Sequence, residues 1–299
     1  MKSLINKVLP SSKINEDVSI SYNSCGNLKP IRLNDLSVIS PIKKELLNIR
    51  NKNKNITIQR CLKKMALIIP YRNREEHLKE FIPAMKKHLD NQNIDYEIII
   101  VEQSHDNVFN RAKLLNIGVL NSSDDREYFV FHDVDFIPAN IDYRYCNHTV
   151  KPFKYVTDED KGGYREYGET ILGGVTMIPK TIFLDINGYS NEYWQWGKED
   201  DDLLFRQLFK GYVPLYDTEG TFDLLPHPPS LTRAIDGEYV SDKNVLQENK
   251  NLYKNNKKLF SKFKRGLSNQ NDSGLNNISD YEITSIIEED NIKTIKVKL

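Results

Sequence analysis

"MALIIPYRNREEHLKEFIPAMKKHLDNQNIDYEIIIVEQ", residues 65–103, decides the fold. The apolar run "MALIIP" (65–70) ends in proline and is typical of a buried strand. The segment after it opens with acidic residues that favour a helix start, and its apolar residues recur at helical spacing: Glu75 and Glu76, then Leu78, Phe81, Ile82, Met85 and Leu89. "DYEIIIVEQ" (95–103) predicts a second strand. Strand, helix and strand in this order predict two parallel strands covered by a helix.

The same alternation continues along the chain. Residues 109–121 predict a second helix and residues 127–138 a third strand, which extends the parallel sheet. Residues 151–170 are polar and contain glycine, which predicts a loop. The other expected elements are a strand and short helix over 171–189, a helix over 199–212, a basic, Asn-rich helix or loop over 244–274, and an antiparallel hairpin over 281–299. We therefore expect an α/β fold with a mostly parallel sheet, helices on both faces and a small C-terminal antiparallel hairpin.

Composition excludes several classes of protein. The chain has 299 residues, and its 42 Lys and Arg balance its 42 Asp and Glu, so no global field draws it to nucleic acid or to an anionic membrane. No apolar stretch reaches the roughly 18 residues of a membrane span, and the N-terminus lacks a signal-peptide pattern. Cys25, Cys61 and Cys146 are few and far apart, so we expect free thiols, no zinc site and no disulfide framework. These features together predict a cytoplasmic protein.

Paired acids end the third predicted strand. "HDVD" places Asp133 and Asp135 two residues apart, so in an extended chain both face the same side. Ligands of an open α/β sheet bind outside the carboxyl ends of its strands. Two carboxylates there suit a divalent cation that bridges a diphosphate. A capped turn would explain the same pair.

Basic residues lie at the predicted starts of two helices. "PYRNR" places Arg72 and Arg74 between a strand and a helix, and "FNRAK" places Phe109 and Arg111 near the start of the next helix. Arginine binds phosphate well at a helix N-terminus, and an aromatic ring beside it could cover a uracil ring. A solvated basic turn and an ordinary core aromatic would explain the same residues.

Two later features are weaker candidates. His227, in "DLLPHPPS", follows an acidic helix and could contact a metal, although most isolated histidines are not ligands. Gly173 and Gly174 either allow a sugar to approach the backbone or form a turn.

"WQWGKEDDDL" (194–203) places four consecutive acids beside the chain's two tryptophans. Adjacent carboxylates repel one another and make a poor interior. A solvated charge run would explain the acids, but it leaves Trp194 and Trp196 unexplained, and Trp often forms one wall of a ligand site. The stretch therefore predicts a binding site.

These motifs together resemble the β1,4-galactosyltransferase family, glycosyltransferase family 7. The similarity is carried by "IIPYRNREEHL", "FNRAKLLNIGV", "FVFHDVDFIP", "LGGVTMIPKTIFLDINGYSNEYWQWGKEDDD" and, more weakly, "SGLNNISDYEI". It covers about residues 64–230, and "HDVD" and "FIPAMKKHL" resemble the xylosylprotein galactosyltransferase branch. The resemblance implies a GT-A fold, Mn²⁺, and inverting, β1,4-type transfer of galactose from a UDP-sugar to a sugar hydroxyl of a glycan or glycoside.

The resemblance also implies a role for each motif residue. Asp200 would be the catalytic base, Glu199 and Asp201 would bind the acceptor, and Asp135 and His227 would bind the metal. The donor would be held by Pro70, Arg72, Arg74, Phe109, Arg111, Asp133, Gly174 and the mobile Trp196. We expect a polar arm of unknown role over 1–60 and a catalytic domain over 61–299, with a donor half at 61–150, an acceptor half at 171–230 and a closing segment at 231–299.

Three departures from the family pattern leave alternatives open. The third metal ligand of the family is replaced by Leu224 or Leu225, and either Asp223 or a water molecule would have to take its place. Gln195 replaces a glycine. Ile171 replaces a tyrosine of galactose-using members, which leaves room for an N-acetyl group and makes UDP-GalNAc a candidate donor. A degenerate protein that binds a UDP-sugar or glycan without turnover is the alternative function, and a nucleotidyltransferase, which would have no evident need for the tryptophan wall, is a third.

Overall fold

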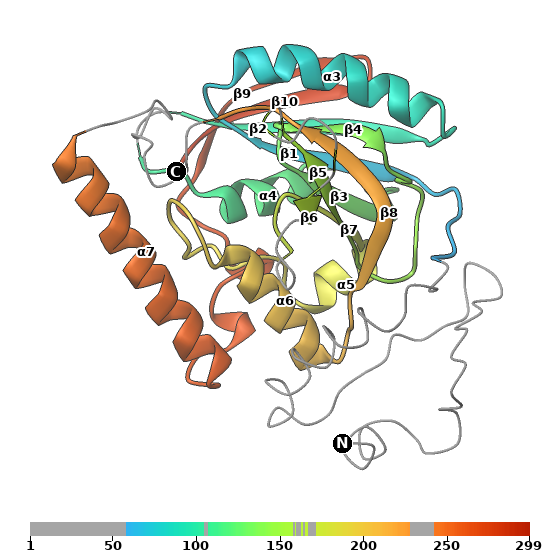
Figure 1. Ribbon diagram of the computed structural model, residues 1–299. Helices are drawn as coiled ribbons and strands as arrows, with labels where there is room; N and C mark the ends of the chain where they lie inside the picture. The colour runs from blue at the N-terminus through green and yellow to red at the C-terminus, as the bar shows by residue number, and fades with distance from the viewer. Residues whose placement is uncertain are drawn as a thin grey trace, which may run out of the picture.

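The computed structural model describes residues 58–299 except 105–106, 158, 160–162, 164, 167–171 and 228–241. Most of the predicted N-terminal arm, Cys25 and Ile171 therefore lie outside the described residues. The described part of the chain forms a single large sheet with helices on both faces (Figure 1).

The parallel half of the sheet is built as predicted. Strand β1 (Met65–Tyr71), buried along its whole length, lies between β2 (Tyr96–Gln103) and β3 (Tyr128–His132) and is parallel to both. Strand β10 (Ile292–Lys298) adds in parallel to β2, and β9 (Glu282–Glu289) pairs antiparallel with β10. The predicted closing hairpin is confirmed, and it extends the main sheet.

The other half of the sheet is mixed. Strand β7 (Val175–Pro179) pairs antiparallel with β3, and β5 (Val150–Val156), β8 (Leu215–Leu224) and β4 (Phe136–Asn140) follow outward. The short β6 (Arg165–Glu166) pairs with β5. The loop predicted over residues 151–170 is wrong for β5 and β6. Pairing with β7 and β8 compensates for the polar sequence of β5, and pairing with β5 does so for β6. The predicted strand over 127–138 is divided at "HDVD" into β3 and β4.

Helices cover both faces. On one face lies α3 (Glu75–Asp90), which buries Phe81, Met85 and Leu89. On the other lie α4 (Arg111–Leu120), α5 (Lys180–Asp185) and α6 (Glu199–Lys210), and α7 (Lys243–Lys264) packs outside α6 (Figure 1). Two short 3₁₀ turns, Gln270–Asp272 and Leu275–Asn277, precede the hairpin.

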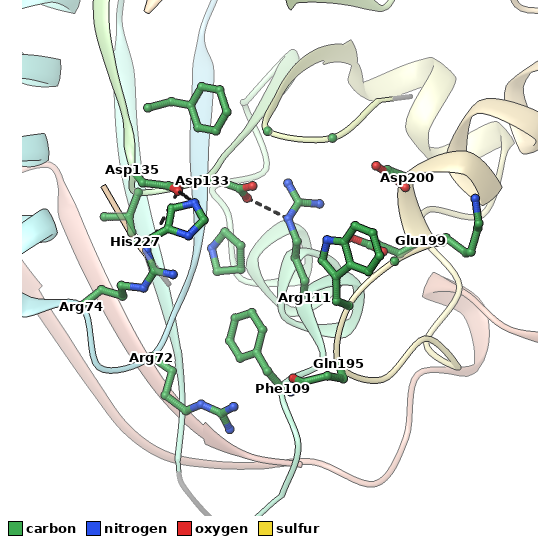
Figure 2. A pocket seen from close by; sticks show the side chains of 18 of the residues that line it. Arg72, Arg74, Phe109, Arg111, Asp133, Asp135, Gln195, Glu199, Asp200 and His227 are labelled. Carbon is green, nitrogen blue, oxygen red and sulfur yellow. Dashed lines mark hydrogen bonds and ion pairs between the residues drawn. The ribbon is translucent and has the colours of Figure 1, made fainter. Parts of the chain in front are cut away.

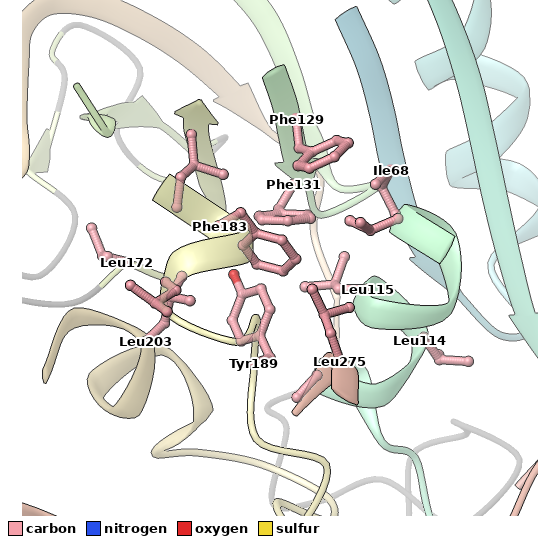
Figure 3. Close-up of a cluster of buried hydrophobic side chains, with 14 of the residues drawn as sticks. Ile68, Leu114, Leu115, Phe129, Phe131, Leu172, Phe183, Tyr189, Leu203 and Leu275 are labelled. Atoms are coloured by element: carbon pink, nitrogen blue, oxygen red, sulfur yellow. The ribbon is translucent and has the colours of Figure 1, made fainter. Parts of the chain in front are cut away.

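The apolar residues form a core on each side of the sheet. Along β1, Met65, Leu67 and Ile69 belong to the cluster under α3, whereas Ala66 and Ile68 belong to the cluster under α4, as strand alternation requires. Figure 3 shows the second cluster, in which aromatic rings from β3, α5 and the segment before α6 pack together: Phe129, Phe131, Phe183 and Tyr189. Gly118 allows α4 to approach β1, because a Cβ atom there would lie 2.3 Å from Ile68 Cγ2.

The cysteines differ from expectation. Cys61 is disulfide-bonded, whereas Cys146 is a free, buried thiol. The prediction of three free thiols is therefore wrong for Cys61, and the cysteines give no support to a reducing compartment. Among the residues described here, no helix is both long enough and apolar enough to cross a bilayer.

Candidate active site

A cavity of about 420 Å³ opens where β1 and β3 end and where α4 and α6 begin. Every site residue predicted from the sequence lines it: Pro70, Arg72, Arg74, Phe109, Arg111, Asp133, Asp135, Gly174, Trp196, Glu199, Asp200, Asp201 and His227. In Figure 2, the side chains of Asp135, His227 and Arg74 lie on one side of the cavity, those of Glu199 and Asp200 lie opposite, and Arg111 lies between. The topology thus brings together residues that lie up to about half the chain apart.

Asp135 and His227 form the first corner of the cavity. His227 Nε2 lies 2.7 Å from Asp135 Oδ2, and Arg74 Nη1 lies 4.0 Å from the same oxygen. The backbone N–H of Leu225 donates to the carbonyl of Asp135 at 2.8 Å, which fixes the segment that carries His227. Burial alone would raise the pKa of Asp135, but the hydrogen bond and charge of His227, with Arg74, lower it to about 2.

This corner suits a divalent cation in its donor chemistry. A carboxylate oxygen and an imidazole nitrogen are ligands that Mn²⁺ accepts, and diphosphate oxygens can complete such a shell. Within the described ranges no group of three or more His, Cys, Asp or Glu side chains gathers around one point. Asp223 is exposed and does not line the cavity, whereas Leu224 does, so the suggested substitution by Asp223 is wrong.

Arginines and aromatic rings form the second corner. Arg111 Nε donates to Asp133 Oδ1 at 2.7 Å, while its buried Nη1 has no hydrogen-bond partner among the described residues. The Arg72 guanidinium lies 5.0 Å from the centre of the Phe109 ring and donates to the carbonyl of Asn107 at 2.7 Å. A buried donor without a partner is costly, so Arg111 is suited to receive an anionic group of a ligand.

The four acids of α6 separate into two groups. Glu199, Asp200 and Asp201 line the cavity, but Asp202 turns away and accepts from Arg206 at 2.5 Å and from Tyr193 at 2.9 Å. Burial and the charge of Asp200 raise the pKa of Glu199 to about 8, and burial and the charge of Asp201 raise the pKa of Asp200. The helix N-terminus offsets part of this crowding of negative charge. Trp196 and three of the four acids thus line the cavity, whereas Trp194 does not, and the site predicted beside the tryptophans stays a prediction.

The glycine pair gives Asp200 its space. A Cβ atom on Gly173 would lie 2.6 Å from Asp200 Oδ2, and Gly174 has φ +70°, with the Phe136 ring 3.0 Å from where its Cβ would be. Gly174 bends the chain at the edge of the cavity that the pair lines, and the approach of a sugar to this backbone stays a prediction. The backbone comes close to a carboxylate here.

Lys151 lies beneath this turn and was not predicted. Its side chain is 1% exposed, and its Nζ donates to the carbonyls of Gly173 and, at 3.0 Å, of Val175. Burial lowers the pKa of Lys151 to about 7, against the opposing charge of Asp133. A fully buried lysine is rare unless its ammonium is partnered, and here it fixes the backbone of the segment that lies against Asp200.

Helix α7 supports the tryptophan segment and was also missed. Asn256 Nδ2 donates to the carbonyls of Trp194 at 2.9 Å and Trp196 at 3.3 Å, and Gln195 Nε2 donates to Asn249 Oδ1 at 3.0 Å. Tyr253 lines the cavity with its ring 5.0 Å from that of Trp196, which is 45% exposed. In the sequence, the Asn-rich composition of 244–274 was the feature that could have indicated this role. Composition does not show which segment the helix contacts.

Comparison with known proteins gives matches over most of the described chain. Residues 24–147 match the N-terminal region of glycosyl transferase group 7, and residues 154–214 match the N-terminal domain of galactosyltransferase. Human β1,4-galactosyltransferase 1 is 35% identical over 213 residues, which is 68% of this chain and 53% of that protein. Xylosylprotein 4-β-galactosyltransferase of Caenorhabditis elegans is 37% identical over 151 residues, 50% of this chain and 52% of that protein. The chain spans about half the length of the curated relatives it matches.

Solved structures give the same fold. The catalytic domain of Drosophila β1,4-galactosyltransferase 7, in complex with xylobiose, matches with a TM-score of 0.59 at 24% identity, over 80% of this chain and 94% of that one. A mutant of that protein, in complex with manganese, UDP-Gal and xylobiose, matches equally well. The expected GT-A fold is confirmed.

Proposed function

Because the chain belongs to glycosyl transferase group 7, we propose that it is an inverting, metal-dependent glycosyltransferase that moves galactose from UDP-galactose to a sugar hydroxyl, with a β1,4-type linkage. One observation carries the proposal. A cavity of about 420 Å³ holds the Asp135–His227 pair at one end and the carboxylate of Asp200 at the other, with Arg111 between them. The Drosophila relative that binds manganese, UDP-Gal and xylobiose has the same fold and supports this assignment.

The donor would occupy the end of the cavity formed by residues 61–150, the donor half. Asp135 and His227 would hold Mn²⁺, which, when bound, would neutralise the diphosphate and ease its departure. Arg111, Arg72 and Arg74 would bind phosphate oxygens, since guanidinium forks match them. Asp133, Pro70, Phe109 and Gly174 would shape the remaining donor pocket, and Trp196 would close over it.

Asp200 would act as the general base from the acceptor half, residues 171–230. The acceptor hydroxyl oxygen forms a bond to the anomeric carbon while the bond from that carbon to UDP breaks, and the electron pair leaves with UDP. The hydroxyl proton passes to Asp200. Burial and Asp201 raise the pKa of Asp200, which makes it a stronger base than an exposed aspartate. Glu199 and Asp201 would orient the acceptor, and residues 231–299 would close the domain.

We extend the proposal to UDP-GalNAc as a second donor. Ile171, two residues before the glycine pair, stands where the resemblance implies a tyrosine in galactose-using members, and a smaller residue there would leave room for an N-acetyl group. A donor panel tests this separately. Strict use of UDP-galactose, with no transfer from UDP-GalNAc, would remove the second donor and leave the main proposal intact.

One observation favours a second candidate function. Leu224 lines the cavity where a third metal ligand is expected, which fits a protein that binds UDP-sugar without turnover. UDP release should be measured with each donor, with and without Mn²⁺, against xylosides and N-acetylglucosaminides. Acceptor-stimulated, Mn²⁺-dependent release that is lost in Asp200→Asn supports the transferase. Retained UDP binding without release from any pair would favour the binding protein.

A further inference from the structure

Helix α7 carries an excess of positive charge that the proposed reaction does not use. Residues 243–265 contain one acid, Glu248, and eight basic residues, in a chain whose acids and bases balance: Lys243, Lys250, Lys254, Lys257, Lys258, Lys262, Lys264 and Arg265. All eight are exposed, and none forms an ion pair with an acid in the described part of the chain. Like charges four residues apart on a helix destabilise it, so the excess has a cost that a bound anion would relieve.

The basic face continues into the mouth of the cavity. The opposite face of α7 is buried through Asn249, Asn256 and Phe263, which turns the lysines to solvent. Between the two faces lies Tyr253, which lines the cavity, and Lys257 Nζ lies 4.8 Å from the centre of its ring. Figure 1 shows α7 along the outside of the molecule beside α6, the helix that carries Asp200. An anion bound on α7 would therefore lie next to the acceptor end of the site.

The spacing of the lysines indicates the form of the partner. Lys250, Lys254, Lys258 and Lys262 form a row along α7, and at about 1.5 Å rise per residue they stand about 6 Å apart. Alternate residues of an extended polypeptide point the same way and lie roughly 6.6 Å apart, close to this spacing. A membrane-bound helix would need apolar side chains on its exposed face, and every apolar side chain of α7 is at least partly buried.

We infer that the exposed face of α7 docks the acceptor polypeptide, binding acidic residues that flank the glycosylated residue while its sugar enters beside Tyr253. This inference rests on the proposed glycosyl transfer and specifies its acceptor as a sugar on an acidic, extended peptide segment. The attraction acts over about one Debye length, roughly 8 Å at physiological salt, so it strengthens binding of the acceptor and leaves the chemical step unchanged.

Matched acceptors and matched variants test the docking surface. The acceptors are a glycopeptide with Asp and Glu at alternate flanking positions, the same glycopeptide with Asn and Gln there, and a simple glycoside of the same sugar. Lys250→Gln/Lys254→Gln/Lys258→Gln removes charge from α7. Lys79→Gln/Lys86→Gln/Lys87→Gln removes the same charge from α3, on the other face of the sheet.

The wild-type protein should prefer the acidic glycopeptide by about tenfold in kcat/KM, since each exposed pair contributes only part of a tenfold step. The preference should disappear in the α7 variant and in high salt, should survive in the α3 variant, and should not extend to the simple glycoside. Equal use of both glycopeptides, or equal losses in the two variants, would overturn the inference.

Direct binding measurements separate this inference from the proposed transfer. Fluorescence anisotropy with the labelled acidic peptide, without a sugar, should show binding that the α7 variant loses even if no acceptor is turned over. Absence of α7-dependent binding would overturn the docking surface. Sedimentation with vesicles of phosphatidylcholine and phosphatidylserine, or binding to a single-stranded oligonucleotide, would overturn it in favour of a membrane or nucleic acid if either bound through α7 while the peptide did not.

Discussion

Gly173 lies directly against Asp200, because a Cβ atom at Gly173 would come within 2.6 Å of Asp200 Oδ2. Gly173→Ala must therefore displace the carboxylate of Asp200. If Asp200 is the base, kcat should fall by about 100-fold, the loss that a displacement of about 1 Å at a reacting group can cause. Steady-state kinetics with UDP-galactose and a simple glycoside measures the effect.

Gly163→Ala is the control for this substitution, because a Cβ there would meet no atom within 4 Å. Its kcat should equal that of the wild type. An unchanged kcat in Gly173→Ala, with stability also unchanged, would show that Asp200 does not act from its present position.

Asp202 should differ from its neighbours by affecting stability and not the reaction. Its carboxylate pairs with Arg206 at 2.5 Å, with both side chains at most 3% exposed, and accepts from Tyr193. Removing one charge of a buried pair costs about 3–5 kcal/mol, so Asp202→Asn should lower the unfolding free energy by that order. Asp200→Asn should instead keep its stability and lose turnover. Urea unfolding beside kinetics distinguishes the two, and equal losses of activity per folded molecule would contradict this division of the acids.

Glu199 should make stability depend on pH. Burial and the charge of Asp200 raise its pKa from 4.5 to about 8, so the folded protein holds this proton where the unfolded chain releases it. The contribution of this group is therefore fully present below pH 4.5 and is lost as pH rises through about 8. Between about pH 5.5 and about pH 9, the unfolding free energy measured in urea should fall more in the wild type than in Glu199→Gln. Equal declines would mean that Glu199 is already ionised in the folded protein.

The candidate site residues could be picked out from the sequence because short motifs carry them. "PYRNR", "FNRAK" and "HDVD" each lie where an apolar segment meets a turn, and the carboxyl ends of neighbouring parallel strands meet at one edge of a sheet. Asp133 and Arg111 could thus be placed near each other without coordinates. Their ion pair, at 2.7 Å, follows from the structure alone.

Lys151 and Tyr253 could not be predicted from the sequence, for different physical reasons. Lys151 lies in a strand whose polar sequence is compensated by pairing with strands distant in the chain, so its own segment predicts a loop. Tyr253 and the asparagines of α7 are recognisable as helix residues, but helical spacing does not say which surface the helix covers. The positions of both residues are determined by packing between segments that are distant in the chain. The periodicity of one segment carries no information about such packing.

Leu224 gives a test of the metal corner. It lines the cavity together with Asp135 and His227, and a histidine there would add a third nitrogen or oxygen donor. Leu224→His should lower the Mn²⁺ concentration for half-saturation by about tenfold, equivalent to about 1.4 kcal/mol. A titration that monitors the electron paramagnetic resonance signal of free Mn²⁺ measures this concentration and needs no activity assay. Asp223→His, on the exposed side of the same strand, is the control, and an equal gain there would place the metal elsewhere.

Asn256 should control the mobility of the tryptophan segment. Its buried amide holds the carbonyls of Trp194 and Trp196, in a segment where Gln195 has φ +63° and Lys198 φ +85°. Non-glycine residues in such conformations cost about 1 kcal/mol or more each, and they persist only when their surroundings fix them. Asn256→Ala should therefore loosen the segment, admit water beside the donor and raise hydrolysis of UDP-galactose relative to transfer.

The chain's only two tryptophans both lie in this segment, so acrylamide quenching of their fluorescence measures its mobility directly. Quenching should increase in Asn256→Ala and stay at the wild-type level in Asn255→Ala, which changes an exposed residue of the same helix. If quenching rises while the ratio of hydrolysis to transfer does not change, the segment moves freely without exposing the donor, and Trp196 is not the residue that closes the site. If neither changes, α7 does not hold the segment.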